Sequence, residues 1–139
     1  MGKNYARAYQ GVFKVGMYAI PWGMPKTLEG PGAVKTLPAL IKERGNKKAL
    51  IVTDKMLMSL GLLNNMLSAM DECGIEYVIY DGVQPNPTNI NVGEGLALFK
   101  ENNCDGLVAF GGGAPMDCAK AIGARVARPR KSVAQLQGL

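Results

Sequence analysis

Three consecutive glycines at 111–113 constrain this chain more than any other feature of its sequence. They follow a short apolar run at 107–110, which predicts a buried strand, and they precede Pro115, which favours the first position of a helix running to about residue 126. The first N–H groups of a helix lack intrahelical partners and lie at the positive end of its dipole. Glycine also lets a phosphate approach the main chain where a Cβ would collide. Residues 111–117 therefore predict a site for a dinucleotide or another phosphate-bearing ligand.

Strand and helix patterns alternate along the rest of the chain. Apolar runs predict strands at 48–53, 75–80 and 105–110, separated by helical stretches of ten or more residues. Such spacing implies right-handed crossovers between parallel strands. We therefore expect an α/β fold, with a Rossmann-like parallel sheet, flanking helices and an N-terminal extended or hairpin segment at 11–19.

Two of the predicted helices carry specific expectations. Pro38 should interrupt a helix over 29–44, and Gly45 should end it. The helix that ends at Gly74 should present a single apolar face to the core, made of Leu62, Leu63, Met66, Leu67 and Met70.

Polar residues just after the predicted strands should meet at one rim, because ligands of parallel sheets bind outside the carboxyl ends of the strands. Asp54 can accept hydrogen bonds from ribose hydroxyls and repel a 2′-phosphate, or it can cap the helix that follows. Asn86 lies in the stiff segment Pro-Asn-Pro-Thr, where its amide could face a ligand or belong to a bare turn. Thr88 is expected to cap the next helix.

Composition excludes several classes of function. The chain has 139 residues and no histidine, so it offers no imidazole as general base, proton relay or metal ligand. We expect no catalytic residue and no metal ligand within it.

The three cysteines lie in unrelated sequence contexts, which is typical of buried apolar side chains and of a reducing, cytoplasmic setting. No apolar run is long enough to span a membrane, and the basic residues at 125–131 are typical of a solvated helix end rather than a nucleic-acid interface.

The segment GGGAPMDCAKAIG resembles the glycine motif of the iron-containing (group III) alcohol dehydrogenases, usually GGGSxMDxAKA. The segments LIVTDK at 50–55 and PNPT at 85–88 also resemble segments of that family and occur in the same order along the chain. The similarity runs from about Tyr9 to Leu139. The resemblance implies an oxidoreductase that passes hydride between a nicotinamide cofactor and an alcohol or aldehyde, with iron polarising the alcohol oxygen in the intact protein. Ala114 departs from the usual serine and removes a hydroxyl able to cap the helix or touch phosphate.

The same resemblance assigns cofactor-binding roles to individual residues. Gly112 and Gly113 should contact the pyrophosphate, Asp54 and Asn86 should lie at the cofactor, and Asp117 should point toward the nicotinamide. The carboxylate at Asp54 favours NAD over NADP. Because Asp117 follows Pro115 closely, it is placed in the first turn of its helix.

The family's iron ligands belong to a helical domain that this sequence does not contain. Residues 1–139 are therefore expected to form a single N-terminal dinucleotide-binding domain, incomplete relative to the family and inactive alone. The unfinished sheet should favour self-association, so a homo-oligomer is expected. Two alternatives stay open: a non-catalytic nucleotide-binding or partner-docking module, and an interaction fragment without ligand affinity that docks through its sheet edge.

Overall fold

The structure is a computed structural model that describes residues 27–136. The described residues from Pro31 onward belong to one compact unit, and residues 27–30 fall outside it. The extended or hairpin segment expected at 11–19 lies outside the described residues. No helix in the described part of the chain is long and apolar enough to cross a membrane.

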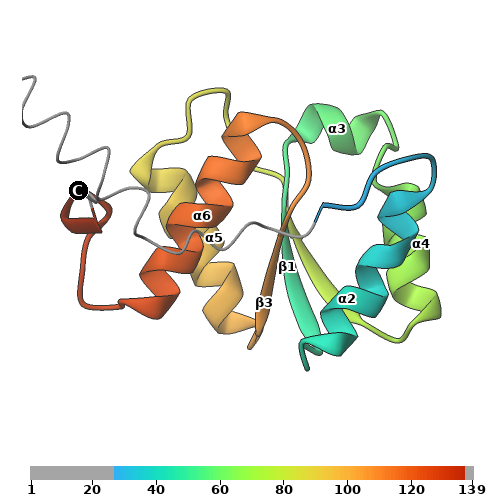
Figure 1. The fold of residues 1–139 in the computed structure, drawn as a ribbon. Coiled ribbons are helices and arrows are strands. Elements are labelled where there is room, and N and C mark those ends of the chain that lie inside the picture. Colours follow the sequence, from blue (N-terminus) through green and yellow to red (C-terminus); the bar gives the residue numbers. More distant parts are fainter. Residues whose placement is uncertain (1–26, 137–139) are drawn as a thin grey trace, which may run out of the picture. The chain divides into compact units, whose positions relative to one another are not determined.

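Three parallel strands form the sheet, in the order β2-β1-β3 (Figure 1). Their bounds are β1 Lys48–Val52, β2 Glu76–Tyr80 and β3 Gly106–Ala109. Each strand begins and ends within one residue of the range predicted for it. In the register, Val52 pairs with Tyr80 on one side and with Ala109 on the other. The strands therefore end level with one another, and the loops that follow them start at a common edge.

Helices cover both faces of this sheet (Figure 1). Leu50 and Val52 of β1 point into a core beneath α5 (Asn89–Glu101) and α6 (Gly113–Ala127). Ala49 and Ile51 point into a second core beneath α2 (Leu37–Glu43) and α4 (Asn64–Glu72). The central strand is buried on both faces, which explains its uninterrupted apolar sequence. The helical elements are η1 (Ala33–Thr36), α2 (Leu37–Glu43), α3 (Lys55–Ser59), α4 (Asn64–Glu72), α5 (Asn89–Glu101), α6 (Gly113–Ala127) and η2 (Val133–Leu136).

The helix expected over 29–44 is shorter and in two parts. A 3₁₀ turn, η1, leads into α2, in which Pro38 occupies the second position, where its missing N–H breaks no helical bond. Gly45, with φ 76°, ends the helix as predicted.

The predicted apolar face before Gly74 is correct except at its start. Leu63, Met66 and Met70 are fully buried, but the Leu62 side chain is 53% exposed. Gly61 adopts φ 67° between α3 and α4, so Leu62 lies in a turn rather than on a helix face.

The cysteines of the described residues are free thiols. Cys104 and Cys118 are buried in the core beneath α5 and α6, and burial raises the pKa of both thiols. They act as apolar side chains, as the sequence predicted, while Cys73 is half-buried beside the opposite core.

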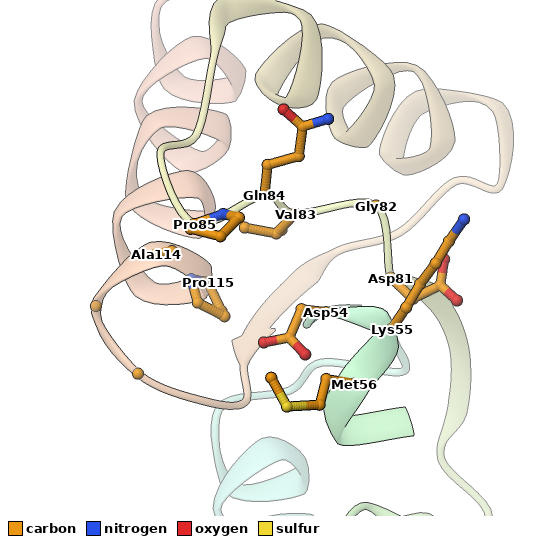
Figure 2. Close-up of a pocket in the computed structure, with 12 residues that line it drawn as sticks. Asp54, Lys55, Met56, Asp81, Gly82, Val83, Gln84, Pro85, Ala114 and Pro115 are labelled. Atoms are coloured by element: carbon orange, nitrogen blue, oxygen red, sulfur yellow. The ribbon is translucent and has the colours of Figure 1, made fainter. Parts of the chain in front are cut away.

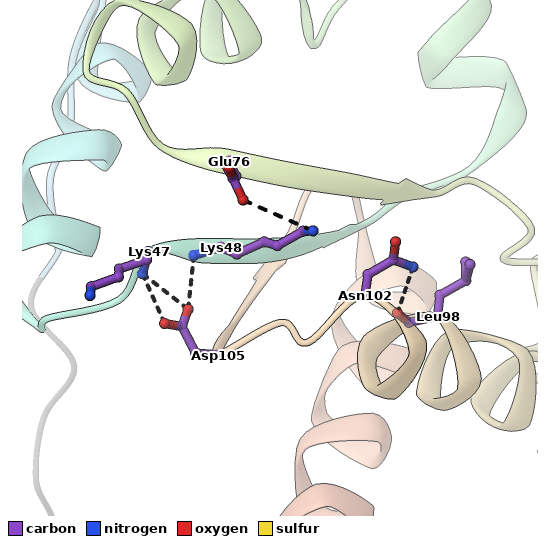
Figure 3. A network of polar contacts seen from close by, with 6 residues as sticks. All are labelled: Lys47, Lys48, Glu76, Leu98, Asn102 and Asp105. Atoms are coloured by element: carbon purple, nitrogen blue, oxygen red, sulfur yellow. Dashed lines mark hydrogen bonds and ion pairs between the residues drawn. The ribbon is translucent and has the colours of Figure 1, made fainter.

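A carboxylate joins β1 to β3 at the amino end of the sheet (Figure 3). Asp105 accepts hydrogen bonds from the backbone N–H of Lys47, at 2.9 and 3.1 Å, and of Lys48, at 3.0 Å. These donors hold the pKa of Asp105 below its ordinary value. Lys48 also forms an ion pair with Glu76 of β2, with Nζ and Oε2 4.0 Å apart.

Candidate functional site

A pocket of about 560 Å³ lies at the carboxyl end of the sheet (Figure 2). Residues 54–56 line it after β1, residues 81–85 after β2 and residues 112–115 after β3. Because β1 lies between the other two strands, the segment at Asp54 lies between the segment at Asp81 and the glycine turn. Of the residues predicted to converge at one rim, Asp54, Gly112 and Gly113 line this pocket, whereas Asn86 and Gly111 do not.

The three consecutive glycines have different structural roles. Gly111 adopts φ 135°, and a Cβ placed there would lie 2.8 Å from Cδ1 of Leu57 and 2.9 Å from Cγ of Pro115. A Cβ on Gly112 or Gly113 would meet nothing within 4 Å. Packing of the protein itself thus requires glycine at 111, whereas the next two glycines border open space in the pocket.

The glycine turn leads directly into α6, a helix of 15 residues. Gly112 is its N-cap and Gly113 its first residue, so the helix begins two residues earlier than predicted and Pro115 occupies the third position. Proline is tolerated there because first-turn N–H groups have no intrahelical acceptor. The N–H groups of Gly113 and Ala114 lie in this first turn at the pocket wall, where an anion would be stabilised.

Asp54 both caps a helix and lines the pocket. Its Oδ1 accepts a hydrogen bond from the backbone N–H of Leu57 at 2.9 Å, which caps α3. One carboxylate oxygen is enough for this cap, so the other can serve a ligand. An isolated antiparallel β-bridge also pairs Asp54 with Gly82, joining the loops after β1 and β2.

Three polar residues of the pocket, Lys55, Asp81 and Gln84, were not predicted as site residues. Asp81 directly follows the last residue of β2, just as Asp54 lies near the end of β1. The rule that singled out Asp54 therefore would also have found Asp81. Lys55 and Gln84 carry no comparable signal in the sequence.

Asn86 and Asp117 lie outside the lining of this pocket, and both are exposed. Pro85, the neighbour of Asn86, does line it. Since α6 starts at Gly113, Asp117 is the fifth helical residue, and its placement in the first turn was wrong. Their roles at a cofactor stay predictions.

The family model described as "Iron-containing alcohol dehydrogenase" matches residues 25–138. The chain belongs to the iron-containing alcohol dehydrogenase family.

Two relatives and one solved structure illustrate the similarity within this alcohol dehydrogenase family. Lactaldehyde reductase of Escherichia coli K12 is 47% identical over 79% of this chain and 29% of the relative. An NAD-dependent methanol dehydrogenase of Bacillus methanolicus is 46% identical over 71% of this chain and 26% of the relative. An NADH-dependent butanol dehydrogenase A of Thermotoga maritima matches with a TM-score of 0.73 at 26% identity, over 82% of this chain and 29% of that structure.

This chain therefore spans less than a third of the length of the alcohol dehydrogenases it matches. It corresponds to their N-terminal part, with the parallel sheet and flanking helices described above.

The iron implied by the family name does not fit the residues described. The sequence holds no histidine, and residues 27–136 contain no group of three or more histidine, cysteine or carboxylate side chains able to hold a metal ion. Iron in proteins is typically held by imidazole or thiolate groups together with carboxylates. The pocket at the glycine turn does fit a dinucleotide, because a Cβ at Gly112 or Gly113 would project into space that a phosphate can occupy.

Proposed function

We propose that this chain forms the NAD-binding part of an iron-dependent alcohol dehydrogenase. The observation that carries the proposal is the open space at Gly112 and Gly113, directly beside the N-terminus of α6. Unpaired N–H groups, the helix dipole and the lack of side chains together suit a pyrophosphate.

The order of the strands supports a proposal for how the remaining parts of the ligand lie. With the pyrophosphate at Gly112 and Gly113, the adenosine ribose reaches the free carboxylate oxygen of Asp54 one strand away. Asp81 lies one strand farther and adds a second negative charge on that side. Two carboxylates near the ribose disfavour a 2′-phosphate, which supports NAD over NADP. The similar methanol dehydrogenase is NAD-dependent and the similar butanol dehydrogenase is NADH-dependent, which supports the same cofactor for this chain.

The nicotinamide end is assigned less directly, through the segments that flank the pocket. We propose that Asp117, one turn along α6, lies toward the nicotinamide, and that Asn86, which adjoins Pro85 of the pocket, lies near the cofactor. When bound, the nicotinamide ring supplies hydride-transfer chemistry with an alcohol or aldehyde. The residues of this chain bind and orient the dinucleotide.

Catalysis and assembly require more than the described residues. Because the donor set does not fit iron, we propose that this chain alone neither holds the metal nor turns over substrate. In the described sheet, β3 pairs with β1 alone, and such an edge favours self-association into a homo-oligomer. The free thiols fit a reducing compartment, so we place the protein in the cytoplasm. We propose neither a nucleic-acid partner nor a membrane partner.

Direct cofactor titration tests this function. Binding of NADH, followed by nicotinamide fluorescence, and of NAD, followed by calorimetry, should each saturate at one ligand per chain. Adenosine diphosphate should compete, because the proposed contacts are with the adenosine and pyrophosphate portions. A natively folded protein that binds none of the three would contradict the proposal.

A further inference from the structure

A buried asparagine joins α5 to the pocket without lining it. Asn91, the third residue of α5, is only 4% exposed. Its Nδ2 donates to the carbonyl oxygen of Gly82 at 3.1 Å and to the hydroxyl of Tyr80 at 3.4 Å, while its Oδ1 accepts from the backbone N–H of Thr88 at 3.1 Å. The amide thus contacts both ends of the loop between β2 and α5.

Tyr80 fixes the orientation of this amide. It is the last residue of β2, and its hydroxyl donates to Oε2 of Glu94 at 2.7 Å. The hydroxyl proton is therefore committed to Glu94, and its oxygen accepts from Asn91. Burial, followed by the hydrogen bond to Glu94, raises the pKa of Tyr80 far above its usual range, so the phenol stays neutral.

The tyrosine ring also supports the floor of the pocket. A Cβ on Gly82 would lie 2.8 Å from Cε2 of Tyr80 and 2.9 Å from its hydroxyl oxygen, so the Gly82 backbone packs directly on the ring. Gly82 lines the pocket and forms the β-bridge with Asp54. A restraint on Gly82 is therefore also a restraint on the position of Asp54.

We propose that Asn91 is a positioning residue for the dinucleotide site, which it stabilises by holding the Gly82 carbonyl over Tyr80. The inference rests on the proposed function, because the loop is held ready for the ligand assigned there. A loop that is ordered before binding loses less conformational entropy when the ligand binds. The same contact keeps the buried amide of Asn91 paired, which a polar group at this depth requires.

Asn91→Asp separates positioning from helix capping. Aspartate keeps an acceptor for the Thr88 N–H and suits a helix N-terminus, but it cannot donate to Gly82 when ionised. The matched control is Thr88→Val, which removes the Oγ1 cap of the Asn91 N–H and leaves the contact with Gly82 in place. Thr88→Val disturbs the capping box and keeps the contact with the pocket loop, whereas Asn91→Asp keeps the capping box and removes that contact.

Two measurements on the full 139-residue chain decide the proposal. Asn91→Asp should weaken NADH binding about threefold to tenfold, because the Gly82 carbonyl of the pocket loop loses its hydrogen bond, and Thr88→Val should leave the affinity unchanged. Hydrogen exchange without ligand should rise at the amides of Gly82, Val83 and Gln84 in Asn91→Asp and stay at the parent level there in Thr88→Val. Equal effects of the two variants, or no effect of Asn91→Asp on the loop amides, would overturn the proposal.

A second variant keeps the test decisive if Asn91→Asp does not fold. Tyr80→Phe keeps the ring beneath Gly82 and removes the hydroxyl that orients Asn91, so it should also raise exchange at the loop amides. Unchanged exchange in Tyr80→Phe would count against the network. The exchange readout needs no cofactor, so a parent protein that fails to bind NADH would refute the proposed function alone.

Discussion

Gly111 and Pro115 lie so close together that a Cβ on the glycine would come within 2.9 Å of the proline Cγ. This contact folds the glycine turn back onto the first turn of α6. With Leu57 on its other side and φ at 135°, Gly111 has neither the space nor the backbone conformation for another residue. Gly111 is therefore required by the packing of the turn, whereas Gly112 and Gly113 face the pocket.

Gly111→Ala should destabilise the fold by about 2 kcal/mol, since it combines backbone strain at positive φ with clashes against the side chains of Leu57 and Pro115. Urea unfolding followed by circular dichroism measures the change. An unfolding free energy within error of that of the parent protein would show that the turn accommodates a Cβ at position 111, contrary to this prediction.

Gly112→Val should abolish NADH binding and lower the free energy of unfolding by no more than about 1 kcal/mol, because valine is a poorer N-cap of α6 than glycine. A Cβ at this position meets no protein atom within 4 Å apart from its chain neighbours, and a valine would fill the proposed pyrophosphate position. Gly93→Val is the matched control, because Gly93 is exposed on α5 and also has open space around a Cβ. Retained affinity in a folded Gly112→Val protein would place the anion site elsewhere.

Asp54→Asn should raise the affinity for NADP relative to NAD by roughly tenfold, because it removes a charge beside the 2′ position. Asparagine still accepts from the Leu57 N–H, so the cap of α3 is kept. Asp54→Gly should relax the same discrimination but also lose the cap. Calorimetry with both cofactors measures the ratio, and Glu101→Gln, at the far end of α5, controls for net charge.

Asp105 should make the stability depend on acid pH. Its pKa is lowered in the folded state, so its stabilisation is complete above the ordinary value of 3.8 and is lost as the pH falls through the folded value. Asp105→Ala should therefore cost about 1 kcal/mol near pH 7, modest because the carboxylate is exposed, and less at pH 2. Chemical unfolding of both proteins at several pH values tests this, and a difference that does not shrink with acid would exclude the carboxylate as its source.

The purified chain should contain no stoichiometric iron and show no NADH-linked turnover of alcohols or aldehydes. The sequence supplies no imidazole, and the described residues gather no metal-binding group. Elemental analysis and a coupled assay measure both, and treatment with a chelator should change neither stability nor NADH binding. Iron or turnover that follows the protein through repeated purification would disprove this expectation.

Much of the architecture follows from local patterns. The apolar run of β1 and the alternation of strands and helices predicted the parallel sheet, and the position of Asp54 and of the glycines predicted their common rim. These features depend on neighbouring residues along the chain, because periodicity and turn chemistry act over a few positions. The capping role of Thr88 was predicted correctly for the same reason.

The sequence by itself determined the strands, the turns and the location of the glycine turn that begins α6. Only the tertiary structure decided that Leu62 is exposed, that Asp117 lies outside the pocket, that Gly111 packs while Gly112 is open, and that Asn91 is buried against Gly82. Each of these depends on which distant segment covers a residue. The residues in such contacts are far apart in the sequence, and no local periodicity indicates that they will meet. The contacts form only when the helices pack on the sheet.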